Sequence, residues 1–292
     1  MKSKAVFIFA LFIFISWIGL AQCIQDTSLV FIEMTDGNEF VGTLVSEDDI
    51  KIELLTEKLG KIIIQKVDIK NRKTISANQI VEGRLWFENP QATRYFWAPN
   101  GYGLKKGEGN YQNIYVLWNQ FSIGVTDNFS VGAGVIPLFL FDGAPTPVFI
   151  TPKISIPIKR DKINLGAGLL AGTILGEDFD SFGLLYGLST FGSRDKNVSI
   201  GLAYGFAGGE WADSPLINVS SLIRASNRMY FVTENYVLPF DEASGVVLGL
   251  GGRWIIKKAA LDFMVGIPII EDMGAFLAIP IIGFTIPFGN TN

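Results

Sequence analysis

The stretch Ser199-Ile200-Gly201-Leu202-Ala203-Tyr204-Gly205-Phe206 alternates large apolar residues with small or polar ones. Successive side chains of an extended strand point to opposite faces, so one face of this stretch carries all its aliphatic and aromatic groups. The other face carries only serine, alanine and glycine. A large apolar face opposite a small one predicts a membrane-barrel strand with its apolar face toward lipid.

The same period of two recurs along the later part of the chain. It puts the large residues of Phe129–Val135 on one face, and it places Phe182, Leu184, Tyr186 and Leu188 toward lipid. Soluble sandwiches also alternate, but their outward face is polar, whereas the larger face is apolar here. The pattern predicts an all-β fold with a transmembrane antiparallel β-barrel over residues 90–292.

Short turns and longer connections alternate along this region. Short turns are expected at 126–128, 159–162, 193–197, 225–228 and 257–258, and longer connections at 138–146, 174–180, 207–214, 239–244 and 269–274. Outer-membrane barrels alternate in this way, with tight periplasmic turns and longer outer loops. The segment from Tyr111 to Phe288 then holds 11 strands. Gln91–Ala98 supplies a twelfth strand that satisfies the even-number rule, and a ten-stranded barrel is the alternative if this segment is only a connector.

Charge divides the two sets of connections by sign. The short turns and their flanks are mainly basic: Lys159, Arg160, Lys162, Arg194, Lys196, Arg224, Arg228, Lys257 and Lys258, against Asp127, Asp161 and Asp195. The longer loops are acidic and hold no lysine or arginine: Asp142, Glu177, Asp178, Asp180, Glu210, Asp213, Asp241, Glu242, Glu271 and Asp272. Seven of these are candidates for binding divalent cations or for attracting cations to a pore entrance: Glu177, Asp178, Asp180, Asp241, Glu242, Glu271 and Asp272.

The start of the chain has the pattern of an export signal. Lys2 and Lys4 precede an uncharged apolar run from Ala5 to Leu20, which predicts a signal peptide over residues 1–21, cut after Ala21. Cys23 is the only cysteine, so no disulfide can form within the chain. A lipoprotein is the alternative, but it needs a small residue before the cysteine, where Gln22 stands.

Residues 26–80 predict a small periplasmic β domain. Short strands with alternating apolar residues surround sharp turns such as Thr35-Asp36-Gly37-Asn38. Five strands in about 50 residues suit an Sm-like or SH3-like small barrel. The hairpin TDGNEFVGTL, residues 35–44, resembles Sm-like modules. An accessory domain without a ligand is the favoured interpretation.

Charged residues within the strands should face the lumen, because an ionised group in lipid costs about 2–4 kcal/mol at mid-depth. If Lys257-Lys258 is a two-residue turn, Arg253 lies opposite Asp262, and Trp254, Leu250, Leu261 and Val265 share the lipid face. We expect this pair to be structural. Lys153 shares the lumen face with Thr151 and Ser155, and the cost of burial favours an inward Glu234.

The loop Pro99–Tyr111 contains GYGLKKGEG, which lacks the phosphate-loop pattern and leads into no helix. We expect it to be a flexible outer loop. Residues Ala92–Gly134, ATRYFWAPNGYGLKKGEGNYQNIYVLWNQFSIGVTDNFSVGAG, resemble the opening of uncharacterised outer-membrane barrel proteins of Gram-negative bacteria in which a small β domain precedes the barrel. That resemblance implies an outer-membrane location and this architecture, and it carries no functional residues.

Composition excludes several function classes. The net charge of −4 and pI near 5.0 argue against nucleic acid as a partner. The absence of histidine removes histidine-dependent hydrolysis and histidine metal ligation. With no convergent nucleophile and base, we expect no enzyme and no cofactor. Two functions remain: a small-solute pore, or a structural or assembly barrel in contact with membrane lipid, whose periplasmic domain binds a partner protein.

Overall fold

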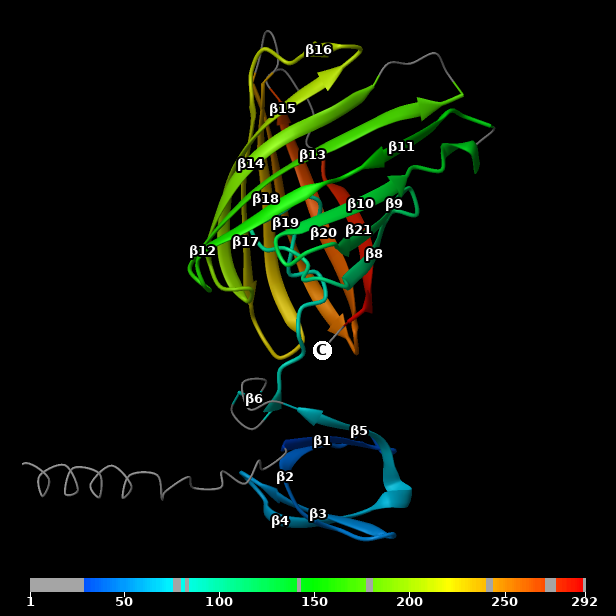
Figure 1. Cartoon of the computed structure of the whole chain (residues 1–292), viewed down its shortest axis with the longest axis vertical. Coiled ribbons are helices and arrows are strands. Elements are labelled where there is room, and N and C mark those ends of the chain that lie inside the picture. Colours follow the sequence, from blue (N-terminus) through cyan, green and yellow to red (C-terminus); the bar gives the residue numbers. More distant parts are fainter. Residues whose placement is uncertain are drawn as a thin grey trace, which may run out of the picture. The chain divides into compact units, whose positions relative to one another are not determined.

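The computed structural model describes residues 29–75, 80–81, 84–140, 143–176, 181–239, 244–270 and 277–290. The expected signal peptide and Cys23 lie outside these residues. The chain divides into two compact units, Met1–Leu85 and Trp86–Asn292 (Figure 1). No helix in the described part of the chain is long and apolar enough to cross a membrane.

The first unit contains a five-stranded antiparallel sheet in the order β4-β3-β2-β1-β5. Its elements are β1 (Leu29–Met34), β2 (Glu39–Glu47), β3 (Lys51–Thr56), β4 (Gly60–Gln65), the 3-10 turn η1 (Lys66–Asp68) and β5 (Ile69–Ile75). Alternate residues of β1, β3 and β4 are buried together, with Val30, Ile32, Ile52, Leu54 and Ile64 as the core. The short strands β6 (Ile80–Val81) and β7 (Arg84–Leu85) pair with each other.

The second unit is a closed antiparallel barrel. Its strands are β8 (Glu108–Ile114), β9 (Trp118–Gly124), β10 (Phe129–Val135), β11 (Thr146–Ile150), β12 (Lys153–Lys159), β13 (Ile163–Leu175), β14 (Phe182–Gly192), β15 (Lys196–Ala207), β16 (Glu210–Trp211), β17 (Leu216–Arg224), β18 (Met229–Pro239), β19 (Ser244–Ile256), β20 (Ala259–Ile270) and β21 (Ile279–Gly289). The 3-10 turn η3 (Leu138–Leu140) lies between β10 and β11.

The ring contains twelve strands in the described part of the chain. β11 and β12 form one strand position, interrupted at Thr151-Pro152, because both pair with β10 on one side and β13 on the other. β16 only extends the edge of β15, so the fourteen strands of the sheet reduce to twelve. β21 pairs with β8 and β9 pairs with β10, which closes the ring.

The twelfth strand is not the one expected from sequence. Gln91–Ala98 forms no barrel strand, and the segment treated as one strand from Tyr111 instead folds as the hairpin of β8 and β9. Its turn, Tyr115-Val116-Leu117, contains no glycine or proline, and Tyr115 and Val116 adopt left-handed φ values of 55° and 66°. Reasoning from the usual turn residues therefore misses this turn.

The ends of the barrel differ in their connections. At one end, here the short-turn end, lie the turns at 125–128, 160–162, 193–195, 225–228 and 257–258, together with the start of β8 and the end of β21. The other end, the long-loop end, carries the remaining connections. The β8–β9 turn is the exception there, because it is also short.

Large apolar side chains cover the outer surface of the ring. Along β15, Ile200, Leu202 and Tyr204 are exposed while Ser199 and Ala203 are buried inside, as the alternation predicted. Phe231, Leu250, Trp254, Phe263, Val265 and Ile282 continue this surface on β18 to β21. Tyr111 on β8 packs on Phe121 of β9 at 4.6 Å and on Phe284 of β21 at 5.8 Å between ring centroids. The closing strands thus share an outward aromatic cluster.

On β14 the predicted orientation is wrong. Leu185 and Phe191 are exposed on the outside, whereas Thr190 is fully buried and Leu184 and Tyr186 line an internal cavity. The rule that large residues face lipid fails here because this part of the lumen is itself lined by large side chains.

Candidate functional site

The lumen is occupied by the chain that precedes the first barrel strand. We call residues Gln91–Gly103 the internal segment; Figure 1 draws it in cyan within the ring of strands. Two nested hydrogen bonds close one loop within it, since the Tyr95 amide donates to the Ala98 carbonyl at 2.9 Å and the Asn100 amide donates to the Thr93 carbonyl at 3.1 Å. This location corrects two expectations, because Gln91–Ala98 is no strand and the first residues of the Pro99–Tyr111 loop lie inside the barrel.

Aromatic side chains of the internal segment pack against the barrel wall. Tyr95 and Phe96 are 0% and 2% exposed, and they join a core formed by inward residues of β17 to β20, including Tyr230, Ile255 and Met264. Burying a side chain of this size stabilises the folded state by about 1.5–3 kcal/mol. The Tyr95 hydroxyl donates to Asn197 Oδ1 at 2.7 Å, and burial raises the pKa of Tyr95, so the hydroxyl stays protonated.

Arg253 joins the wall to the internal segment. Its Nε donates to Asp262 Oδ1 at 2.7 Å and its Nη2 to Asp262 Oδ2 at 3.2 Å, in the register that the two-residue turn predicted. Its Nη1 donates to the Gln91 carbonyl at 2.9 Å, and its Nη2 also donates to the Tyr95 carbonyl. Arg253 is 0% exposed. Removing either partner of such a buried pair would leave an uncompensated charge, at a cost of about 3–5 kcal/mol.

Glu234 binds the backbone amides of the same loop. Its Oε2 accepts hydrogen bonds from the backbone amides of Phe96 at 2.7 Å, Trp97 at 3.0 Å and Ala98 at 3.0 Å. The Tyr236 hydroxyl donates to its Oε1 at 2.6 Å. Three successive amides that converge on one carboxylate form an anion-binding nest, filled here by a side chain of the barrel.

Lys153 and Arg94 form a third link between the wall and the segment. The Lys153 ammonium donates to the Tyr102 carbonyl at 2.6 Å and to the Thr93 carbonyl at 3.2 Å. Arg94 Nη1 donates to Gln112 Oε1 on β8 at 2.6 Å and to Gln120 Oε1 on β9 at 3.2 Å. Side chains of β8, β9, β12, β18 and β19 therefore all hydrogen-bond to the internal segment.

Close backbone contact fixes the end of the internal segment. The Gly101 amide donates to Thr190 Oγ1 at 2.7 Å, and a Cβ at Gly101 would lie 2.6 Å from the Asn164 carbonyl oxygen, so only glycine fits there. The Tyr102 hydroxyl donates to the Gly192 carbonyl, and burial raises the pKa of Tyr102. The GYG sequence is thus a packing feature of the lumen.

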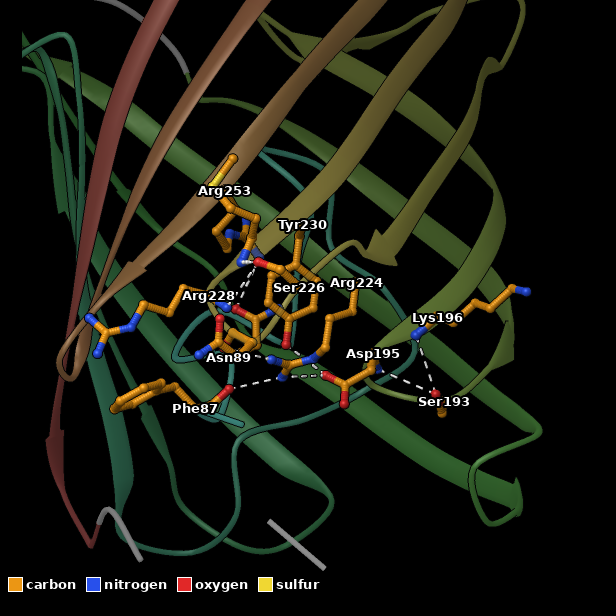
Figure 2. A network of polar contacts seen from close by, with 12 residues as sticks. Phe87, Asn89, Ser193, Asp195, Lys196, Arg224, Ser226, Arg228, Tyr230 and Arg253 are labelled. Atoms are coloured by element: carbon orange, nitrogen blue, oxygen red, sulfur yellow. Dashed lines mark hydrogen bonds and ion pairs between the residues drawn. The ribbon is translucent and has the colours of Figure 1, made fainter. Parts of the chain in front are cut away.

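A polar network closes the short-turn end, and Figure 2 shows its side chains directed toward one another. Arg224 Nη2 donates to Asp195 Oδ1 at 2.8 Å and to the Phe87 carbonyl at 2.9 Å. The Tyr230 hydroxyl also donates to Asp195 Oδ1, at 2.7 Å, while the Arg224 guanidinium lies 4.4 Å from the Tyr230 ring centroid. These contacts attach the chain just before the internal segment to two turns of the barrel.

On the other side of the internal segment the lumen holds a cavity of about 490 Å³. Thr93, Arg94, Trp97 and Pro99 of the segment form part of its lining. Its wall is mostly apolar, with side chains from β13, β14, β17, β18 and β19, among them Leu170, Leu184, Leu188, Leu216, Leu238 and Val247. Lys153, Gln120 and Asn218 add polar groups.

The structure places Lys153, Glu234, Arg253 and Asp262 in the lumen, where each is at most 8% exposed, and it joins the last two directly. The acidic outer-loop candidates Glu177, Asp178, Asp180, Asp241, Glu242, Glu271 and Asp272 all lie outside the described residues. Within the described residues, no three potential metal ligands of the His, Cys, Asp or Glu types come together. Sequence reasoning missed Arg94, whose only signal was a charge within an aromatic stretch.

No protein-family model and no curated protein matches the chain. Among solved structures, the chain matches outer-membrane expressed OmpT of Vibrio cholerae at 12% identity and a TM-score of 0.35, over 89% of this chain and 94% of that chain. A loop L8 deletion mutant of the same protein matches at 11% identity and a TM-score of 0.35, over 90% of this chain and 97% of that one. The trimer form of in-vitro folded OmpT matches at 10% identity and a TM-score of 0.31, over 90% and 96% of the two chains.

Proposed function

We propose that the protein is an outer-membrane barrel whose lumen is gated by its own internal segment, so that small solutes pass only when that segment moves. The observation that carries the proposal is the set of buried links from Arg253, Glu234 and Lys153 to the backbone of the segment. A closed barrel with an apolar exterior is one of the two architectures that can satisfy every backbone group in lipid. The occupied lumen argues against a permanently open pore.

Single-channel recording in planar bilayers tests the gate. We expect the wild-type protein to stay closed for most of the record, and the double variant Glu234→Ala, Lys153→Met to open for long periods because two of the links are lost. Arg160→Gln is the control, since Arg160 is an exposed turn residue that ends in solvent. A wild-type protein with steady conductance equal to that of the double variant would contradict a gate. Heat-modifiable migration on gels verifies that each variant is folded.

The basic short turns and acidic longer loops support a periplasmic short-turn end. Cysteine placed at Asp178 in a Cys23→Ser background should react with an impermeant reagent on intact cells, whereas cysteine at Lys196 should react only after the outer membrane is opened. Labelling in the reverse order would overturn this orientation, together with the periplasmic location of the N-terminal unit.

A second candidate function is partner binding by the N-terminal unit, which we propose to be an Sm-like periplasmic domain. Exposed apolar side chains favour it: Ile50, Leu59 and Val67 are 70%, 65% and 85% exposed. A photo-crosslinking residue at Val67 should give one discrete protein adduct in cells, and one at the exposed Lys58 should give none. The absence of an adduct at Val67 would leave the unit as an accessory domain.

A further inference from the structure

We propose that the cavity on the long-loop side of the internal segment binds an amphipathic anion, an apolar chain ending in a carboxylate or phosphate group, with Arg94 and Lys153 facing the anionic end. The proposal rests on the gated barrel described above, because the internal segment supplies one of the two cations and part of the cavity wall.

The basic side chains at the cavity point to an anionic ligand. Arg94 and Lys153 both line the cavity, and neither has a carboxylate within ion-pair distance in the described part of the chain. Glu234 influences Arg94 electrostatically, but its oxygens already accept hydrogen bonds from the segment's amides and from Tyr236. Asp262 is paired with Arg253. Arg94 and Lys153 are therefore basic side chains at the cavity whose neighbouring carboxylates, Glu234 and Asp262, are already engaged by other groups.

The hydrogen-bond donors at the cavity point to the same kind of ligand. Arg94 uses only Nη1 in hydrogen bonds to described residues, so its Nε and Nη2 have no partner there. Lys153 uses two of its three ammonium protons. The hydroxyl of Tyr186, which also lines the cavity, has no hydrogen-bond partner among the described residues. A carboxylate or phosphate supplies the acceptors that these donors lack.

The apolar wall of the cavity requires an apolar part in the ligand. Beyond the two cations the cavity is lined by leucines, by Val247 and by the rings of Trp97 and Trp118. A small hydrated anion would leave the apolar side chains of this wall in contact with water. An apolar ligand without a charge would leave the two basic side chains unpaired. Only a ligand with both parts satisfies the whole cavity. The volume of about 490 Å³ is in the range of small-molecule sites.

The geometry also gives the direction of binding. Leu216 begins β17, Leu238 nearly ends β18 and Val247 lies early in β19, so these lining residues are at the long-loop ends of their strands. Arg94 and Lys153 lie on and against the internal segment, deeper in the barrel. The ligand therefore enters from the long-loop end with its anionic group first.

The test is binding to the full-length protein in nanodiscs of zwitterionic phosphatidylcholine, followed by tryptophan fluorescence, since Trp97 and Trp118 line the cavity. The probe is laurate, and its comparators are dodecanol, which has the chain without the charge, and acetate, which has the charge without the chain. We expect laurate to bind at least about tenfold more tightly than either comparator, because a charge-assisted hydrogen bond is worth a factor of ten or more.

Three variants locate the site. Arg94→Gln should weaken laurate binding about tenfold or more, and its matched control Arg160→Gln, an exposed turn arginine, should leave it unchanged. Ala203→Phe should also weaken binding, because Ala203 lines the cavity on β15 and a larger side chain there would take up part of the space for the apolar chain. Equal affinity for laurate and dodecanol, no binding of laurate, or equal loss in both arginine variants would each overturn the proposal.

Two sources can supply such a ligand, a free acid from outside the cell or a phospholipid of the membrane. Native mass spectrometry of the protein extracted from cells separates them by the mass of the bound species, and a bound mass of either class supports the proposal. Conductance separates this inference from the gate: a closed wild-type channel that binds no laurate contradicts only the ligand, whereas steady conductance contradicts the gate itself.

Discussion

Two substitutions of Glu234 should distinguish the loss of its hydrogen-bond acceptor oxygen from the loss of its charge alone. In Glu234→Ala the amides of Phe96, Trp97 and Ala98 lose the oxygen that they share. Each buried donor left without a partner costs about 1–3 kcal/mol, so three of them should lower the free energy of unfolding by about 3 kcal/mol or more. Glu234→Gln keeps one acceptor oxygen toward the amides and should cost only about 1 kcal/mol, the difference between charged and neutral hydrogen bonds.

The measurement is reversible urea unfolding from detergent micelles, followed by tryptophan fluorescence. Thr233→Ala is the control, because Thr233 directly precedes Glu234 in the strand, points away from the lumen and shares a hydrogen bond with the Ser221 hydroxyl. It should cost about 1 kcal/mol or less. An alanine variant of Glu234 that is no less stable than the glutamine variant would contradict this prediction, and so would two variants that both match the control.

Three further changes have defined outcomes. The cycle of Arg253→Met and Asp262→Leu should give single losses of about 3–5 kcal/mol and a coupling of about 1 kcal/mol or more in the same unfolding assay, and strictly additive losses would mean no contact. Val116→Gly should raise the free energy of unfolding by about 1 kcal/mol, because a β-branched residue is strained at a φ of 66°, and a destabilised variant would show that the valine side chain contributes more than its strain. Hydrogen bonds from Lys66 and then Arg72 lower the pKa of Glu47 below 4.5, so their stabilisation of the N-terminal sheet is fully present above that pH and is lost as the pH falls through the folded-state pKa. Hydrogen exchange corrected for intrinsic rates should show this loss in the wild-type protein and a flatter profile in Glu47→Gln.

The features that sequence predicts well are those fixed locally. The two-residue turn at Lys257-Lys258 sets the register of β19 and β20, and a register shift would move every side chain to the other face. The pairing of Arg253 with Asp262 therefore follows from the turn length and the position of each residue along its strand. The alternation of β15 is equally clear, because its large and small residues never exchange faces.

The features that sequence does not predict depend on what fills the lumen. Tyr95 and Phe96 have the composition of a lipid-facing strand, but their apolar surface is covered by a second core inside the barrel. The same reasoning misplaces Leu184 and Tyr186, which line the cavity. Periodicity reports that a side chain leaves water, and it does not distinguish lipid from an apolar interior.

The pairing of β8 with β21 has a consequence for how the barrel is made. Ile114 lies opposite Gly283 and Glu108 opposite Gly289, so the joint unites the first strand of the barrel with the last. Contacts between such distant parts of a chain form late in folding, because the entropy of closing a long loop opposes them. The internal segment precedes β8 in the chain, and it can pack against β12 to β19 before β21 pairs with β8 to close the sheet. Insertion would then wrap the last strand around a segment already in place, and in the finished barrel that segment can leave only along the barrel axis.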